Sequence, residues 1–407
     1  DCGLGGGEDK IPGFEMVGAE EREQVDDVFK SGGVLCRRGF DEQRNGCFKV
    51  DEFEEAFAAR MGVPRALAVT SGTAALRVAL AALGVGPGDE VITQSFTFVA
   101  TVEAIIEAGA TPVCAEIDAS LNMDPSDLHL RITHRTRAVI VVHMLGTPAR
   151  LHEVLAACDQ RGIPVIEDTA WGCGGSLDGR PLGTWGQIGT FSFDHAKTMT
   201  TGEGGMVVFR GEEVWRRAAA WHDHGHENNP DVPRWEDTRS GSGFNYRMME
   251  LQAAVGLAQL KKLTQVVASQ VANRDSMWDA IGDLPGIGLR DVPDGSSETA
   301  DALVFFAADK GQARTCHNRL LDAGVLTKIL PEAISWHFAG TWDHMPELLE
   351  SHGGNLDEEF PRSRAFIERA VSIPVTVEMD PGLPMLLRRV LAGVLGAQMM
   401  PDPESRA

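Results

Sequence analysis

From about residue 65, short apolar runs rich in β-branched residues alternate with amphipathic helical patterns. The runs are Ala66–Thr70, Glu90–Thr93, Thr111–Asp118, Ala138–Leu145, Pro164–Asp168, Ile188–Phe193 and Met206–Phe209. Between the earlier runs lie segments such as Ala75–Leu83, in which Leu76, Leu80 and Leu83 recur at helical spacing. This alternation predicts an α/β fold with a largely parallel sheet covered by helices on both faces. The last runs follow one another too closely for helices, so we expect part of the sheet to be antiparallel.

A long helical pattern, from about Met248 to Leu284, divides the chain into two parts. Its apolar residues are spaced by three or four positions, as at Leu260 and Leu263, which predicts a helix that bridges two domains. A strand and two helices are predicted beyond it, at Leu303–Ala307, Ala313–Ala323 and Ser363–Ala370. A chain of this length usually has more than one core. We therefore expect a large domain at 12–262 and a smaller α+β domain at 263–400.

The composition is that of a globular protein with an acidic surface. Hydrophobic residues make up 43% of the 407 residues and charged residues 24%, and 59 acidic against 37 basic side chains give a formal net charge of -22. Such a surface repels nucleic acid and anionic membranes. No apolar run approaches the ~20 residues needed to span a bilayer. We expect neither nucleic acid nor a membrane among the partners.

The seven cysteines are scattered singly, with no CxxC pair to suggest a zinc or iron–sulfur site. The histidine-rich run Trp221–His226 lacks ligand spacing on a clear helix, so we interpret it as a loop near the substrate and predict no metal. Dispersed thiols in odd number fit a reducing cytoplasm. The acidic, glycine-rich segment Asp1–Asp9 is unlike the basic start of a signal peptide. We expect a soluble, cytoplasmic protein.

Three polar clusters follow predicted strands, at the edge where open α/β sheets bind ligands. The first, Thr70–Leu76, runs from small and hydroxyl residues straight into a helix. The amides of the helix's first turn, with the hydroxyls of Ser71 and Thr73, would form an anion site suited to a phosphate. An ordinary N-cap by either hydroxyl explains the same residues. The pattern alone leaves both interpretations open.

The second cluster, Val165–Trp171, follows the apolar strand that Asp168 closes. A carboxylate at this edge can keep a heterocyclic nitrogen protonated. The alternative is that Asp168 caps a helix or a loop, as aspartates at such positions often do.

In the third cluster, Lys197 stands between the aromatic strand Phe191–Phe193 and the glycine turn Gly202–Gly205. A lone lysine is mostly a solvated surface residue. A lysine whose pKa is lowered by burial becomes a nucleophile that can form a Schiff base. A phosphate cradle, a strand-end aspartate and then a lysine are the parts that a pyridoxal 5'-phosphate site needs. We therefore predict Lys197 and Asp168 as the catalytic residues of a pyridoxal-phosphate enzyme.

Motifs spread along nearly the whole chain from about Pro12 resemble those of the DegT/StrS family of sugar aminotransferases. They are Ser71–Leu76, Phe96–Thr101, Glu167–Asp168, Phe191–Lys197, Gly202–Gly205 and Asn245–Met248. The resemblance implies the fold type I scaffold of pyridoxal-phosphate transferases, with a mixed, mostly parallel sheet in the large domain. It also implies transamination from an amino acid, glutamate being the expected donor, to a keto or aldehydo sugar.

The resemblance further implies roles for individual residues. Lys197 would hold the cofactor as a Schiff base and move a proton between the substrate carbon and C4′ of the cofactor. Asp168 would pair with the ring nitrogen, and Phe98 would stack on the ring face. The positions that lie near the substrate in the family are Arg247, Trp336 and His337.

The phosphate of the cofactor has four expected ligands. By resemblance, Gly72, Thr73 and Ser192 bind it from the same chain. Asn245 would reach it from the neighbouring subunit, which makes a homodimer the expected active unit.

Trp171 is a cofactor-binding position that departs from the family pattern. Many members carry Gln, His or Glu there, in contact with the cofactor's phenolic oxygen, whereas an indole N–H donates one hydrogen bond but cannot accept a proton. The runs Glu167–Ser176 and Ser335–His344 resemble a subgroup that includes 8-amino-3,8-dideoxy-manno-octulosonate aminotransferases.

Two alternatives to a transaminase share the fold. One is a pyridoxal-phosphate sugar dehydratase, which ranks lower because family dehydratases replace the lysine with histidine and this chain retains Lys197. The other is a non-catalytic regulator, against which the intact Lys197 and Asp168 both argue.

Overall fold

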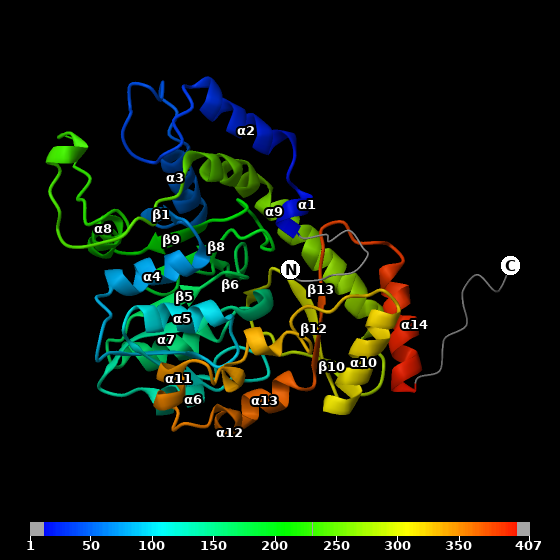
Figure 1. Cartoon of the computed structure of the whole chain (residues 1–407). Helices are drawn as coiled ribbons and strands as arrows, with labels where there is room; N and C mark the ends of the chain where they lie inside the picture. Colours follow the sequence, from blue (N-terminus) through cyan, green and yellow to red (C-terminus); the bar gives the residue numbers. More distant parts are fainter. Residues whose placement is uncertain (1–11, 230, 397–407) are drawn as a thin grey trace.

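The structure, a computed structural model, describes residues 12–229 and 231–396 and is built around a seven-stranded sheet (Figure 1). In spatial order the strands are β1 (Arg65–Val69), β9 (Gly205–Phe209), β8 (Ile188–Ser192), β5 (Val165–Asp168), β4 (Thr136–Val142), β2 (Glu90–Gln94) and β3 (Thr111–Ala115). All run in one direction except β9, which is antiparallel to both of its neighbours. The seven predicted strands and the mixed, mostly parallel sheet are confirmed.

Helices cover both faces of this sheet because its strands are apolar on both sides. In β1, Leu67 and Val69 face one layer, whereas Ala66 and Ala68 face the other. The first layer holds α4 (Gly72–Ala82), α5 (Val99–Glu107) and α8 (Glu212–Trp221). The second holds α3 (Lys49–Met61), α7 (Leu151–Asp159) and the first half of α9 (Glu250–Ile281). The predicted two-sided arrangement is therefore confirmed.

The C-terminal part has a second, antiparallel sheet with its own core. Its strands are β10 (Ile287–Leu289), β12 (Ala302–Ala307) and β13 (Ala370–Pro374), and its helices are α10 (Lys310–Asp322) and α14 (Leu383–Leu395). Further elements of the described chain include α1 (Pro12–Glu15), α2 (Ala19–Lys30), α6 (Pro125–Arg131), α11 (Pro346–Ser351), β6 (Ser176–Leu177), β7 (Arg180–Pro181) and β11 (Ser296–Ser297). No helix within the described ranges is long and apolar enough to cross a membrane.

The division that we expect at 262/263 falls inside α9, which is one continuous helix (Figure 1). Its residues up to Leu263 pack in the core beside the large sheet, whereas Met277 and Ile281 pack in the core of the small sheet. This packing supports the division, which we keep as a proposal. The last residues of the expected second domain, 397–400, lie outside the described residues.

The helix predicted at Ser363–Ala370 is wrong at its C-terminal end. The helix α13 (Pro361–Ile367) stops earlier, and Ala370 already begins β13. In that strand Val371 and Ile373 point into the core of the small domain, and such alternation favours a strand over another helical turn.

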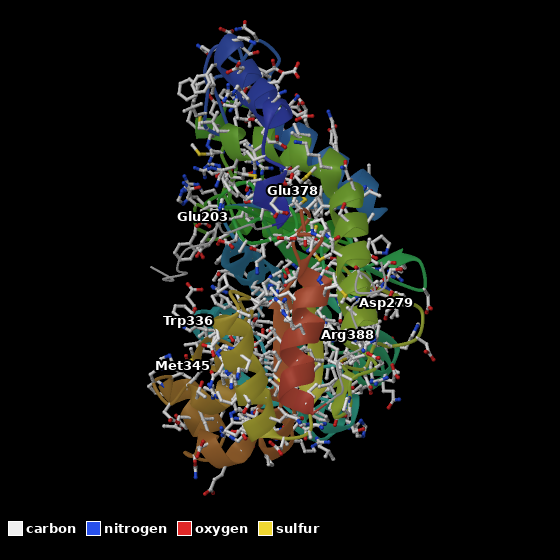
Figure 2. All side chains as sticks on the ribbon, turned by 90° about the vertical axis from the view of Figure 1, so that its right-hand side faces the viewer. Glu203, Asp279, Trp336, Met345, Glu378 and Arg388 are labelled. Carbon is white, nitrogen blue, oxygen red and sulfur yellow. The ribbon has the colours of Figure 1, made fainter. Side chains whose placement is uncertain are left out.

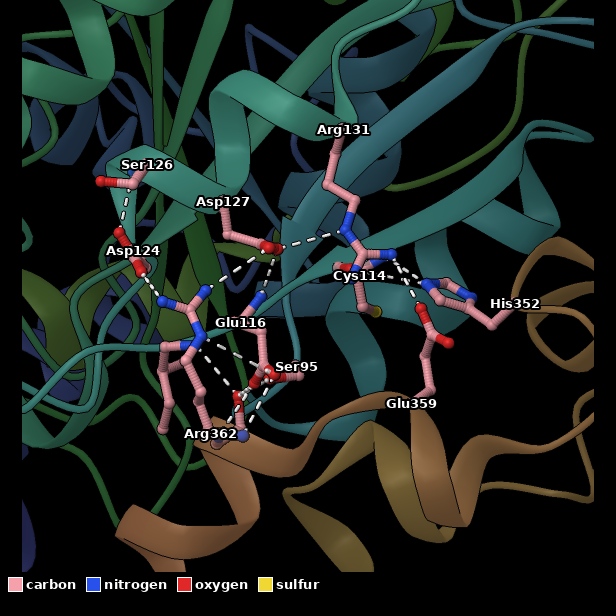
Figure 3. A network of polar contacts seen from close by, with 12 residues as sticks. Ser95, Cys114, Glu116, Asp124, Ser126, Asp127, Arg131, His352, Glu359 and Arg362 are labelled. Atoms are coloured by element: carbon pink, nitrogen blue, oxygen red, sulfur yellow. Dashed lines mark hydrogen bonds and ion pairs between the residues drawn. The ribbon is translucent and has the colours of Figure 1, made fainter.

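A polar network ties the segment around α12 (Leu356–Glu359) and α13 to the end of β3 (Figure 3). Glu116, which follows β3, accepts a hydrogen bond of 2.7 Å from the amide of Ser363. Arg362 Nη1 lies 2.6 Å from Asp124 Oδ2, and Ser363 Oγ lies 2.8 Å from Ser95 Oγ. This network holds the C-terminal segment against the edge of the sheet at which β2 ends.

Candidate active site

A cavity of about 340 Å³ opens where β1, β5 and β8 end, at the carboxyl edge of the sheet. Of the residues predicted from the sequence, those that line it are Gly72, Thr73, Phe98, Asp168, Trp171, Ser192, Lys197 and His337. Asn245, Arg247 and Trp336 do not line it. A larger hollow, of about 710 Å³, lies beside α3 and α8 and contains none of the predicted residues.

One end of the cavity is formed by the N-terminus of α4. Ser71 is the N-cap, and its Oγ accepts a hydrogen bond of 3.1 Å from the amide of Ala74. The amides of Gly72 and Thr73 belong to the first turn and have no partner within the helix. A Cβ atom on Gly72 would lie 2.8 Å from Ser192 Cβ, so only glycine allows this approach. The N-cap and the anion site that the sequence left as alternatives are therefore compatible.

Asp168 ends β5 and is 7% exposed, with its carboxylate directed into the same cavity. Its Oδ2 accepts a hydrogen bond of 3.0 Å from Thr101 Oγ1, and its Oδ1 accepts one of 3.2 Å from the amide of Ala170. Burial raises the pKa of this carboxyl group, and these two hydrogen bonds oppose the rise. A carboxylate in such surroundings attracts a protonated partner such as a ring N–H.

Lys197 lies in the loop after β8, where its amide donates a hydrogen bond of 3.1 Å to Asp194 O. Its Nζ is 3.8 Å from the centroid of the Trp171 ring. Burial lowers the pKa of Lys197 to about 8, Asp301 opposes this shift, and the charge of Lys328 adds to it. A lysine with a lowered pKa carries more free amine at neutral pH and is a better nucleophile.

Aromatic rings form the wall that faces these groups. The ring centroids of Phe98 and His337 lie 5.5 Å apart, and those of Trp171 and His337 lie 6.0 Å apart. His337 Nδ1 donates a hydrogen bond of 3.0 Å to Ala333 O, and burial lowers the pKa of His337 to about 4. Trp336 stacks on Phe98 with ring centroids 6.2 Å apart but is 60% exposed at the surface (Figure 2).

Asn245 and Arg247 lie on the loop between α8 and α9 and do not line the cavity of their own chain, although Arg247 pairs with Val69 at the end of β1. Asn245 is exposed, and its Oδ1 accepts a hydrogen bond of 3.2 Å from the amide of Arg247. Arg247 pairs with the buried carboxylate of Asp223, which also binds Arg234 Nη2 at 2.5 Å. Within the described ranges, no group of three or more His, Cys, Asp or Glu side chains could hold a metal ion.

Three residues of the site were not predicted from the sequence. Thr101 lies within a quoted motif, but only the structure shows its hydrogen bond to Asp168. Lys328 lines the cavity, and its Nζ lies 2.7 Å from Oδ2 of the buried Asp301. Nothing in the sequence indicates that Lys328 and Asp301 pair, because they lie in separate elements of the C-terminal part.

The residues that meet in the cavity fit pyridoxal 5'-phosphate. The N-terminus of α4 and the glycine approach to Ser192 suit its phosphate, because helix N-termini bind such anions. Asp168 suits its ring nitrogen, and Lys197 supplies the amine.

Comparison with known proteins agrees with this geometry. The model of the DegT/DnrJ/EryC1/StrS aminotransferase family matches residues 19–383. The spore coat polysaccharide biosynthesis protein SpsC of Bacillus subtilis (strain 168) is 32% identical over 376 residues, 90% of this chain and 92% of that protein. GDP-perosamine synthase of Vibrio cholerae is 36% identical over 262 residues, 64% of this chain and 68% of that protein. Among solved structures, DesV of S. venezuelae in complex with a ketimine intermediate has a TM-score of 0.79 and 27% identity, covering 96% of this chain and 99% of that chain.

Proposed function

The chain belongs to the DegT/DnrJ/EryC1/StrS aminotransferase family and is a pyridoxal-phosphate-dependent aminotransferase of fold type I, and from that premise we propose that it transfers an amino group from glutamate to the carbonyl carbon of a sugar. One observation carries the proposal. Lys197, Asp168 and the N-terminus of α4 come from three separate parts of the sequence and meet in one cavity.

The bound cofactor supplies an electron sink for the carbon that gains or loses the amino group. Lys197 would hold it covalently, and the Nζ of Lys197, when free, would move the proton at the donor's α-carbon. Asp168 keeps a proton on the ring nitrogen, and Thr101 orients the Asp168 carboxylate through its hydrogen bond. Phe98 lines the same cavity, where it would cover the ring face and help to exclude water.

The acceptor is proposed to be a sugar or a sugar-like carbonyl compound. Support comes from the relatives, because one is a GDP-perosamine synthase and another belongs to the biosynthesis of a spore coat polysaccharide. The aromatic wall of Phe98, Trp171 and His337 offers apolar faces to the C–H groups of such a ring. The indole N–H of Trp171 is a hydrogen-bond donor, whereas His337, whose Nδ1–H is donated to Ala333 O, offers Nε2 as an acceptor.

An acidic amino donor is supported by the second ammonium group of the cavity. Lys328 lines the cavity, and Asp301 holds its Nζ at 2.7 Å. An ammonium group carries three N–H donors, and its ion pair with Asp301 leaves donors for a carboxylate. We assign Lys328 to a carboxylate of the donor.

The active unit is proposed to be a homodimer in which Asn245 completes the phosphate site of the partner. Asn245 is exposed on its own chain, and the same loop carries two large exposed rings, Trp235 at 84% and Phe244 at 54%. A contact with a second copy of the chain would cover these rings. We also propose a cytoplasmic location, because Cys114, Cys158 and four further cysteines are free thiols in the structure.

The test begins with the covalent link. Purified protein should absorb visible light, and borohydride reduction should fix the cofactor to the peptide that contains Lys197. Lys328 is the matched control, since it lines the same cavity. A label on Lys328, or the absence of bound cofactor, would overturn the assignment. Product analysis with glutamate and a panel of keto sugars then tests the two substrates.

A further inference from the structure

The Nζ atom of Lys197 lies over the face of the Trp171 indole, 3.8 Å from the ring centroid. Within residues 12–229 and 231–396, the structure gives this atom no hydrogen-bond acceptor and no carboxylate at ion-pair distance. The ring face is therefore the contact that holds the amine.

The nearby charged groups are engaged elsewhere. Both oxygens of Asp168 accept hydrogen bonds, from Thr101 and from the amide of Ala170. Asp194 Oδ1 accepts a hydrogen bond of 3.0 Å from the amide of Ala196, and Asp301 pairs with Lys328. These four charged side chains act on Lys197 through space rather than by contact.

The Trp171 ring is fixed in its place. It is 6% exposed and packs in the core cluster at the base of the cavity, and Thr299 Oγ1 donates a hydrogen bond of 2.8 Å to its backbone oxygen. Because Trp171 follows Asp168, the last residue of β5, within one turn, the aromatic face and the carboxylate are placed together.

An ammonium group over an aromatic face is attracted by the negative face of the ring, and the attraction is largest where water is excluded. We propose that Trp171 is a positioning residue that holds the free ammonium group of Lys197 over its indole whenever the lysine is not bound to the cofactor. This inference rests on the proposed function, in which Lys197 carries pyridoxal phosphate.

The consequence concerns proton affinity. Burial disfavours the charged amine and lowers the pKa of Lys197, whereas the ring favours the charged form and limits that fall. An indole face cannot accept the proton itself. A cation–π contact in such a site is worth roughly one unit of pKa.

The test weakens the ring without changing its shape. A series of proteins is produced in which all 8 tryptophans are replaced by a fluorinated tryptophan, with more fluorine atoms on the ring in each successive protein. The fluorine atoms withdraw negative charge from the ring face. The cofactor is removed, and the rate at which the apoprotein captures pyridoxal phosphate is measured against pH to give the pKa of Lys197. The same series in Trp171→Phe is the control, since that variant keeps a ring but has no indole at this place.

We expect the pKa of Lys197 to fall stepwise with fluorination, by up to about one unit, in the wild-type chain but not in Trp171→Phe. Unfluorinated Trp171→Phe should lie below the wild type, because benzene is the weaker ring. A pKa independent of fluorination in the wild type, or equal trends in both proteins, would overturn the inference. Thermal melting of each protein shows that the fold is retained. Reduced peptides that carry the cofactor at another lysine would instead overturn the proposed function.

Discussion

Thr101 Oγ1 donates a hydrogen bond of 3.0 Å to Oδ2 of Asp168, and both side chains are buried. Because the proton of Thr101 goes to Asp168, the contact of 2.9 Å between Thr97 Oγ1 and Thr101 Oγ1 has Thr97 as its donor. The two threonines therefore form a short chain of hydrogen bonds that ends on the carboxylate. This chain opposes the effect of burial, which raises the pKa of Asp168.

Replacing Thr101 with valine keeps the shape of the side chain and removes this hydrogen bond. The pKa of Asp168 should rise further, and the affinity for pyridoxal phosphate should fall about ten- to a hundredfold, as expected for a lost hydrogen bond to a charged group. Equilibrium dialysis of the apoprotein measures this affinity. Thr97→Val, which acts on Asp168 only through Thr101, should lose less affinity for the cofactor. In a separate measurement, Asp168→Asn should slow transamination by about thirty- to a thousandfold, because it removes the charged partner of the ring nitrogen. Unchanged affinity in Thr101→Val would show that the bond does not orient Asp168.

Lys197 should make the stability of the apoprotein depend on pH in a defined window. Its pKa is lowered from 10.5 to about 8, so between these values the unfolded chain binds more protons than the folded one. The free energy of unfolding of the wild type, relative to Lys197→Met, should therefore rise as the pH increases across this window and stay level below it. Urea denaturation of both apoproteins at several pH values measures the difference. Lys310→Met, at an exposed lysine, is the control and should track the wild type. Parallel curves for wild type and Lys197→Met would contradict the shift.

Removing the charge of Lys328 should affect the amino donor and not the sugar. Because Lys328→Met alone leaves Asp301 buried without its partner, the variant to use is Lys328→Met with Asp301→Asn. The apparent KM for glutamate should rise about ten- to a hundredfold, with little change for the carbonyl acceptor. Separate measurement of the two half-reactions by absorbance decides this, and Lys328→Arg should retain most of the affinity. A rise confined to the acceptor would assign Lys328 to the sugar instead.

The large sheet could be predicted closely because its strands contain short apolar runs and most of their residues are buried. Strands such as β4 are buried on both faces, so the pattern marks them without knowledge of their neighbours. The secondary structure of the C-terminal part was harder to predict from the sequence, because its elements are defined by contacts between distant segments. The strand β13 was not predicted because the helical pattern before it was extended to Ala370, and its pairing with β12 shows where the strand begins.

The residues of the site differ in the same way: some are indicated by the local sequence pattern, and others only by contacts between distant segments. Lys197 and Asp168 stand next to apolar strands, and their position relative to those strands was visible in the sequence. Lys328 and Asp301 carry no such mark, since a lysine and an aspartate in loops are ordinary surface residues until the fold brings them to 2.7 Å. The ring contact between Trp171 and Lys197 was likewise beyond a pattern, because it depends on two loops meeting.

The proposed sharing of the site between two subunits can be tested by mixing two inactive variants. Lys197→Ala removes the anchor, and Asn245→Asp places a negative charge where the partner's phosphate would bind. Neither variant should be active alone. In a shared site, Lys197 and Asn245 of one active site come from different chains. After subunit exchange, one site of each mixed dimer therefore collects both lesions and the other collects none.

Activity should then return to about one quarter of the wild-type value, because half of the dimers in an equal mixture are mixed and each has one intact site. If each site were built from a single chain, every site would carry a lesion, and mixing would restore nothing. Native mass spectrometry must show that mixed dimers have formed, since exchange that fails also gives no activity. With exchange demonstrated, an inactive mixture would assign Asn245 to its own chain, where it is exposed and bonded to the amide of Arg247.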